Sequence, residues 1–231
     1  MNAEILKVRL DFTEPVLGTC PGNPELHEEF IASRVREDKG PRAEQAEQLM
    51  AEEKQVIKQM SEEEEISEQV EKTSTVFARD DTGLFAFDYQ LKGFLKEALR
   101  TQIDLGYSKI SRWTYKRLVD STLFVYPRRI YFHTPQGDIW RKAEASKSRP
   151  LRAETMRGER IALANSEMLP AGTWLECEFH LLTPVAGLKS KQYLLTMETV
   201  KDCLDYGKLK GFSQWRSGSF GRFLWHSKSD G

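Results

Sequence analysis

The chain has 231 residues, 39% of them apolar, which is enough for one elaborated domain with a buried core. Its formal net charge of −1 gives no global basic excess of the kind that marks many nucleic-acid binders. Three widely spaced cysteines without a CxxC pair, no apolar leader and no apolar run of ~20 residues argue against a disulfide framework, secretion and a membrane span. We therefore expect a cytoplasmic protein with reduced thiols, no membrane partner and no metal or cofactor.

The N-terminal segment alternates strictly between apolar and polar residues from Leu6 to Phe12, which predicts a strand with one buried face. The dipeptide Asn23-Pro24 then favours a helix start. From Glu25 to Lys72 the chain carries fifteen acidic and seven basic side chains, a net charge of −8 that leaves about +7 for the rest. We interpret residues 24–72 as an acidic helical insertion in a single domain that spans residues 1–231. The insertion is either a solvated helical arm or a lid or docking arm that repels polyanions.

The next two segments, "TVFARDDTGLFAFD" and "YQLKGFLKEALRTQI", predict a hairpin and an amphipathic helix. The hairpin should turn at Asp81-Thr82-Gly83. Apolar residues of the helix recur at spacings of three and four, and we expect this face to be buried: Leu91, Phe94, Leu95, Ala98 and Leu99. Another face of the same helix carries a basic ridge, which we define as Lys92, Lys96 and Arg100.

The second half of the chain supplies further strands and one helix. "LFVYPRRIYFHTPQGDIW" predicts two or three short strands, "TWLECEFHLL" one alternating strand, "YLLTMETVKDCLDYG" a helix that ends at Gly207, and "FGRFLWH" a last strand. Between them, Arg141 to Arg160 contains seven basic and three acidic residues without clear periodicity. We expect an irregular segment there, either a flexible loop that contacts nucleic acid through Arg149 and Arg152 or an ordinary surface connection.

Without the insertion, the predicted order is strand, helix, strands, helix, strand. This order favours an α+β fold, an antiparallel sheet with helices on one face in the βαββαβ arrangement of a ferredoxin-like or RRM-like core. Four aromatic residues of this core either pack inside it or stack on bases: Trp113, Tyr115, Tyr126 and Tyr131.

The most distinctive segment is "LKGFSQWRSGSFGRF", from Leu209 to Phe223, which we call the glycine loop. Glycine permits close backbone approach to a ligand, arginine supplies a planar fork of donors, and tryptophan supplies a stacking face. This combination suits a phosphate, although a tight turn with Trp215 in the core would also use such residues. The candidate binding residues of the loop are Lys210, Gly211, Trp215, Arg216, Gly218, Gly221 and Arg222, with Trp215 as the stacking residue.

Three segments, in this order, resemble the RAMP superfamily, the RNA-binding proteins that include backbone subunits of type III-like CRISPR effector complexes. "YQLKGFLKEALR" is similar to the family's "GSSLKGALR" helix. "RPLRAETMRGERIALANSEMLPAGTWLECEF" resembles its central pattern that leads through "lPaGT" into a strand, and "GFSQWRSGSFGRF" resembles its C-terminal glycine-rich loop. The resemblance covers roughly residues 1–20 and 76–231.

The resemblance implies an RNA-binding protein of a CRISPR-type ribonucleoprotein, or a stand-alone relative from a phage or mobile element. It places guide or single-stranded RNA against the glycine loop and the basic ridge, and other subunits or copies of the chain beside it. We expect a positive sheet and the glycine loop to hold the phosphate backbone, with little base specificity. We expect binding without catalysis; an enzyme of this kind would be a ribonuclease.

Two other functions stay open. The glycine loop would also serve as an anion site in a protein that sequesters or hydrolyses a nucleotide. Alternatively, the helical insertion makes the chain an interaction protein that binds a protein partner.

Overall fold

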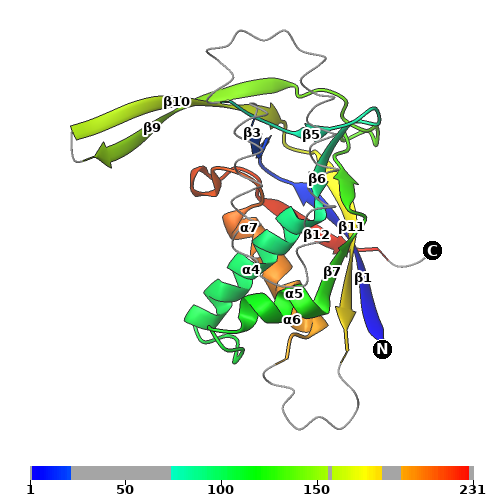
Figure 1. Ribbon diagram of the computed structural model, residues 1–231. Coiled ribbons are helices and arrows are strands. Elements are labelled where there is room, and N and C mark those ends of the chain that lie inside the picture. The colour runs from blue at the N-terminus through cyan, green and yellow to red at the C-terminus, as the bar shows by residue number, and fades with distance from the viewer. Residues whose placement is uncertain (1, 22–73, 156–157, 184–193, 229–231) are drawn as a thin grey trace, which may run out of the picture. The chain divides into compact units, whose positions relative to one another are not determined.

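The structure is a computed structural model that describes residues 2–21, 74–155, 158–183 and 194–228 (Figure 1). The insertion predicted over residues 24–72 lies outside the described residues. The chain divides into two compact units, and the short strands β2 (Val16–Leu17) and β6 (Leu84–Phe87) lie where it passes from one to the other. The first unit comprises Met1–Val16, Phe85–Trp140 and Pro170–Gly231, and the second comprises Leu17–Leu84 and Arg141–Leu169.

A four-stranded antiparallel sheet forms the centre of the first unit, with the strand order β12-β1-β11-β7. Together with the helices described below, this sheet confirms the predicted α+β class. Its members are β1 (Ala3–Phe12), β7 (Leu123–Tyr126), β11 (Trp174–Leu182) and β12 (Phe223–Ser227).

One face of this sheet is apolar because β1 and β11 both alternate in burial, as their sequences predict. The register brings Val8 opposite Cys177 and Leu10 opposite Leu175, so buried positions lie side by side across the strands. The Phe12 ring extends this core, because three further rings have their centroids between 5.9 and 6.1 Å from it: Phe132, Phe212 and Phe223.

Helices cover this apolar face, and Figure 1 shows α4 and α6 on one side of the sheet. The predicted amphipathic helix is α4 (Asp88–Asp104), and the apolar face expected from the sequence is the face it buries. At its start, Gln90 Oε1 accepts a hydrogen bond from the Phe87 amide at 3.1 Å, which satisfies one donor of the first turn. In the described part of this unit the other α-helices are α5 (Tyr115–Thr122), α6 (Met197–Asp205) and α7 (Gly207–Lys210).

The first unit also contains β8 (Arg129–Tyr131), which pairs antiparallel with β6.

All three cysteines of the chain are free and buried, and burial raises the pKa of Cys203 to about 12. None of the helices within the described ranges has the length and apolar character that crossing a membrane requires.

The second unit is built on a long strand, β10 (Gly158–Leu169), which pairs antiparallel with β9 (Ala145–Thr155) and parallel with β4 (Ser74–Val76). The described part of this unit also contains two short strands, β3 (Cys20–Pro21) beside β4, and β5 (Ala78–Arg79). The side chain of Glu167 on β10 links two segments of this unit. Its carboxylate accepts a hydrogen bond from the Phe77 amide at 2.8 Å and pairs with Arg79.

The expectation of an irregular segment from Arg141 to Arg160 is wrong. Residues from Ala145 onward form β9, and Gly158 begins β10. The sequence of β9 has no apolar alternation and contains Pro150, but β9 has a continuous antiparallel partner in β10. Because strand formation depends strongly on the partner strand, this pairing outweighs the weak local propensity.

Candidate nucleic-acid interface

The glycine loop begins at the end of α7, ends at the first residue of β12 and closes on itself between them. The Phe212 amide donates to the Gly221 carbonyl at 2.7 Å, and the Gly221 amide donates to Pro15 O at 2.8 Å. Gly211 and Gly221 have φ angles of +81° and +69°, and a Cβ at either position would overlap backbone atoms of the opposite side of the loop. These two glycines are therefore required by close approach of the loop to itself.

The backbone amides of the three predicted phosphate-binding glycines are engaged within the chain. Gly211 N donates to Gly207 O at 3.0 Å and Gly218 N to Trp215 O at 2.8 Å, while Gly221 N donates to Pro15 O. In this conformation these amides are not available to a phosphate.

The loop contains three non-glycine residues with left-handed backbone conformations. Ser213 has a φ of 77°, Trp215 of 49° and Ser219 of 70°, on either side of the short helix η2 (Arg216–Gly218). Such conformations cost roughly 1–2 kcal/mol each and are uncommon outside glycine. Local strain of this kind clusters at binding and catalytic sites, so the loop is a site candidate on its backbone alone.

Two basic side chains of the loop converge on one carboxylate of α4. Arg216 Nη1 pairs with Glu97 Oε2, and Lys210 Nζ lies 3.6 Å from Glu97 Oε1. All three side chains are about one third exposed. The sequence alone did not identify Glu97. This acidic residue lies among the basic residues of α4, and the loop that pairs with it comes more than a hundred residues later in the chain.

Arg222 and Trp215 complete the loop. The Arg222 carbonyl accepts a hydrogen bond from the Thr13 amide at 2.9 Å, which ties the end of the loop to the end of β1. The Arg222 side-chain Nε is buried without a hydrogen-bond partner among the described residues. The Trp215 ring stacks on Phe220 with centroids 4.9 Å apart and is 37% exposed. Trp215 therefore does not fill the core. This contradicts the interpretation of the loop as a tight turn with Trp215 in the core.

The basic ridge of α4 is largely occupied by contacts within the chain. Lys96 Nζ lies 2.6 Å from an Asp120 carboxylate oxygen, and Arg100 Nε lies 2.7 Å from Asp104 Oδ2. The hydrogen bond to Asp104 raises the pKa of Arg100. Lys92 lies over the Phe124 ring at 5.3 Å. Exposed and partly exposed ion pairs contribute little to stability, so a phosphate could replace these carboxylates at little cost.

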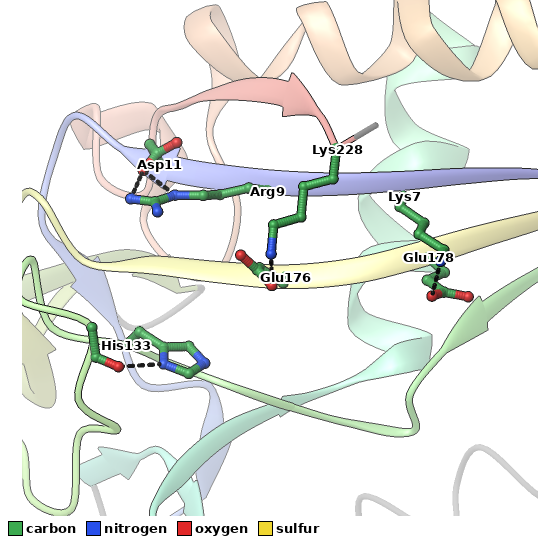
Figure 2. A network of polar contacts seen from close by, with 8 residues as sticks. Lys7, Arg9, Asp11, His133, Glu176, Glu178 and Lys228 are labelled. Atoms are coloured by element: carbon green, nitrogen blue, oxygen red, sulfur yellow. Dashed lines mark hydrogen bonds and ion pairs between the residues drawn. The ribbon is translucent and has the colours of Figure 1, made fainter. Parts of the chain in front are cut away.

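The outer face of the sheet in the first unit is balanced in charge, which corrects the expectation of a positive sheet. Figure 2 shows its ion pairs, which join Lys7 to Glu178 at 3.8 Å, Arg9 to Asp11 at 2.7 Å and Lys228 to Glu176 at 2.6 Å. The antiparallel register causes this balance, because it sets the basic residues of β1 opposite the acidic residues of β11.

Trp174 lies among these charges. The guanidinium of Arg9 lies 4.0 Å from its ring centroid, and the His133 ring stacks on it at 4.1 Å. The aromatic residues expected from the sequence differ among themselves, since Tyr115 is buried whereas Trp113 and Tyr126 are exposed.

The two arginines predicted in the second half of the chain belong to β9. Arg149 is partly buried, and desolvation lowers its pKa. The side chain of Arg152 lies outside the part of the structure that is described. Within that part, no three His, Cys, Asp or Glu side chains gather closely enough to hold a metal ion.

No family model and no curated protein matches the sequence. Among solved structures, a chain of a Type IV-B CRISPR complex is similar to this one, with a TM-score of 0.44 and 7% sequence identity. The likeness covers 98% of this chain and 91% of that chain.

Proposed function

We propose that the protein binds single-stranded RNA through the phosphate backbone, as a RAMP-like subunit of a ribonucleoprotein. The observation that carries the proposal is the convergence of Arg216 and Lys210 on the Glu97 carboxylate. Arginine and lysine bind phosphate oxygens with the same charge-assisted geometry that they use for carboxylates. The Glu97 carboxylate thus marks the place where a backbone phosphate would bind, and Arg222 lies on the same loop.

The topology of the first unit supports a ferredoxin-like core for this function. The four strands of its sheet and the helices α4 and α6 follow one another in the chain order β1, α4, β7, β11, α6 and β12. The sheet order β12-β1-β11-β7 sets the first and third strands of this series at its centre. We therefore propose the βαββαβ arrangement, with the glycine loop entering its last strand. The three sequence segments that resemble the RAMP superfamily support the same assignment.

Neutralising Glu97 tests the proposal most sharply. In the variant Glu97→Gln the two cations lose their internal anion, and the carboxylate no longer repels an approaching phosphate. Affinity for a fluorescein-labelled single-stranded RNA, measured by anisotropy, should rise several-fold. The dependence of log affinity on log salt should become steeper by about 0.7 for each additional phosphate that the protein neutralises.

Two further variants complete this experiment. Arg216→Ala should weaken binding by about tenfold or more, since a hydrogen bond to a charged group contributes ~1.5–3 kcal/mol. Lys201→Ala removes one charge from an exposed position on α6 and should change affinity by less than twofold. If Glu97→Gln lowers the melting temperature but neither Glu97→Gln nor Arg216→Ala alters RNA binding, the cluster only holds the loop closed and the proposal fails. Tight binding of a mononucleotide without binding of RNA would favour the nucleotide-sequestering alternative.

A further inference from the structure

The connection between α4 and α5 displays the three most exposed large apolar side chains in the described part of the chain. Trp113 is 92% exposed, Tyr107 82% and Leu105 66%. We call residues 105–117, which comprise this connection and the first three residues of α5, the aromatic-basic loop. An exposed leucine needs no explanation, but two aromatic rings this exposed within seven residues of sequence indicate a binding surface.

This loop is held in place by its own contacts. Ile110 and Tyr115 are buried and anchor it to the first unit. The Tyr107 amide donates to Gln102 O at 2.9 Å, and the Trp113 amide donates to Ser111 Oγ at 3.3 Å. A ring presented from an anchored backbone loses little conformational freedom on binding, which favours affinity.

The charge of the aromatic-basic loop is positive and largely uncompensated. Its four basic residues are exposed, and its sequence contains no acidic residue: Lys109, Arg112, Lys116 and Arg117. Arg112 Nε lies 3.4 Å from Asp104 Oδ1, just before the loop. In the described ranges, the other three cations have no carboxylate partner, unlike Lys96 and Arg100 of the basic ridge.

We infer that the aromatic-basic loop is a base-stacking site for single-stranded RNA, with Trp113 and Tyr107 as the stacking rings. This inference rests on the proposed function and adds a second contact to it, since the glycine loop binds phosphates whereas these rings bind bases. Exposed rings among unpaired cations are the combination that single-stranded nucleic acid needs, because each base offers a flat face beside a charged phosphate. The loop carries four basic residues and no acidic residue, and this charge favours a polyanion such as RNA as its partner.

The test compares two fluorescein-labelled probes of equal length, a 12-nucleotide adenosine RNA and an abasic oligoribonucleotide. Trp113→Ala should weaken binding of the adenosine RNA by about tenfold and leave binding of the abasic probe within twofold of the parent. Trp113→Phe should retain most of the affinity because it keeps an aromatic face. Leu105→Ala is the matched control, since it removes an exposed apolar side chain without a π face and should change neither affinity. Adenosine RNA without the fluorophore should also quench part of the tryptophan emission of the parent, and that part should be absent from Trp113→Phe.

The outcomes separate this inference from the proposed function. Equal binding of the adenosine RNA by the parent and Trp113→Ala, with Arg216→Ala still impaired, overturns the stacking site and leaves the proposed function in place. A parent chain that binds neither probe overturns both. If Trp113→Ala converts a dimer into a monomer in light scattering and binds RNA like the parent, the loop is a self-association surface and the inference is wrong. The melting temperature of Trp113→Ala should equal that of the parent, since the side chain is exposed.

Discussion

Gly221 is the residue at which the glycine loop has the least room. Its φ is +69°, and an added Cβ would overlap the Phe212 carbonyl oxygen. We therefore expect Gly221→Ala to lower the free energy of unfolding by about 2 kcal/mol or more, from backbone strain and from displacement of the Phe212 backbone. Urea denaturation followed by circular dichroism measures this change.

Gly93 provides the matched control for Gly221. It is exposed on α4, and a Cβ there would meet nothing within 4 Å. Gly93→Ala should stabilise the protein by about 0.5–1 kcal/mol, because alanine is the better helix former. A Gly221→Ala variant as stable as the parent would show that the loop opens without cost and that its closure is not part of the folded state.

At the residue scale, the sequence identifies the glycine loop but not the partners of its residues. Glycine and arginine are recognisable from their chemistry, so the sequence singles out Gly221 and Arg216 as candidates. The groups that these two residues meet depend on how the chain folds: the Phe212 backbone lies against Gly221, and the Glu97 carboxylate pairs with Arg216. Local sequence does not encode such contacts in a readable pattern, which is why the sequence alone suggests that the glycine amides face a ligand.

At the scale of single elements, the start of α4 carries an ionisable group with a clear pH signature. Burial raises the pKa of the Asp88 carboxyl above its ordinary value of 3.8, although a hydrogen bond from the Tyr89 amide and the charges of Arg128 and Lys92 oppose the shift. A carboxyl whose pKa is higher in the folded state stabilises the fold when protonated. That contribution is complete below pH 3.8 and is lost as the pH rises through the folded-state pKa.

Asp88→Asn removes this dependence, because asparagine is uncharged throughout. At pH ~3, where Asp88 is largely protonated, the free energies of unfolding of the variant and the parent should differ only by an amount that does not depend on pH. Its advantage over the parent should then grow as the pH rises above 3.8 and level off above the raised pKa of Asp88. Denaturant titrations at a series of pH values provide the measurement. An advantage that shrinks as the pH rises would mean that the negative charge stabilises the helix start more than burial penalises it.

Elements with a strong internal pattern were predictable, and elements that depend on a partner strand were not. The buried face of α4 follows from spacings of three and four, and β11 from its alternation. β9 has neither pattern, and its strand conformation exists through its pairing with β10. The balanced charge of the outer sheet face has the same origin, since it follows from the register between β1 and β11.

At the scale of the whole molecule, the described residues on either side of the acidic segment Glu25–Lys72 lie close to each other. β3 pairs antiparallel with β4, and Pro21 lies opposite Thr75. A short linker can therefore connect the two strands as a hairpin loop. The element order of the first unit is complete without this segment, so its removal should leave the first unit intact.

We expect a chain in which Gly-Ser replaces Glu25–Lys72 to unfold in a single cooperative transition and to bind single-stranded RNA faster than the parent. The deletion removes a net charge of −8, so the charge of the chain rises from −1 to +7. Attraction between this charge and the RNA should raise the association rate at low salt, and the difference should diminish as salt screens it. Stopped-flow anisotropy at several salt concentrations measures the rate.

A matched chain that keeps the full segment, with eight of its glutamates changed to glutamine, separates the effect of charge from that of length. If the shortened chain loses cooperative unfolding, the segment belongs to the core; if it folds but associates no faster than the parent at low salt, the acidic segment does not repel RNA.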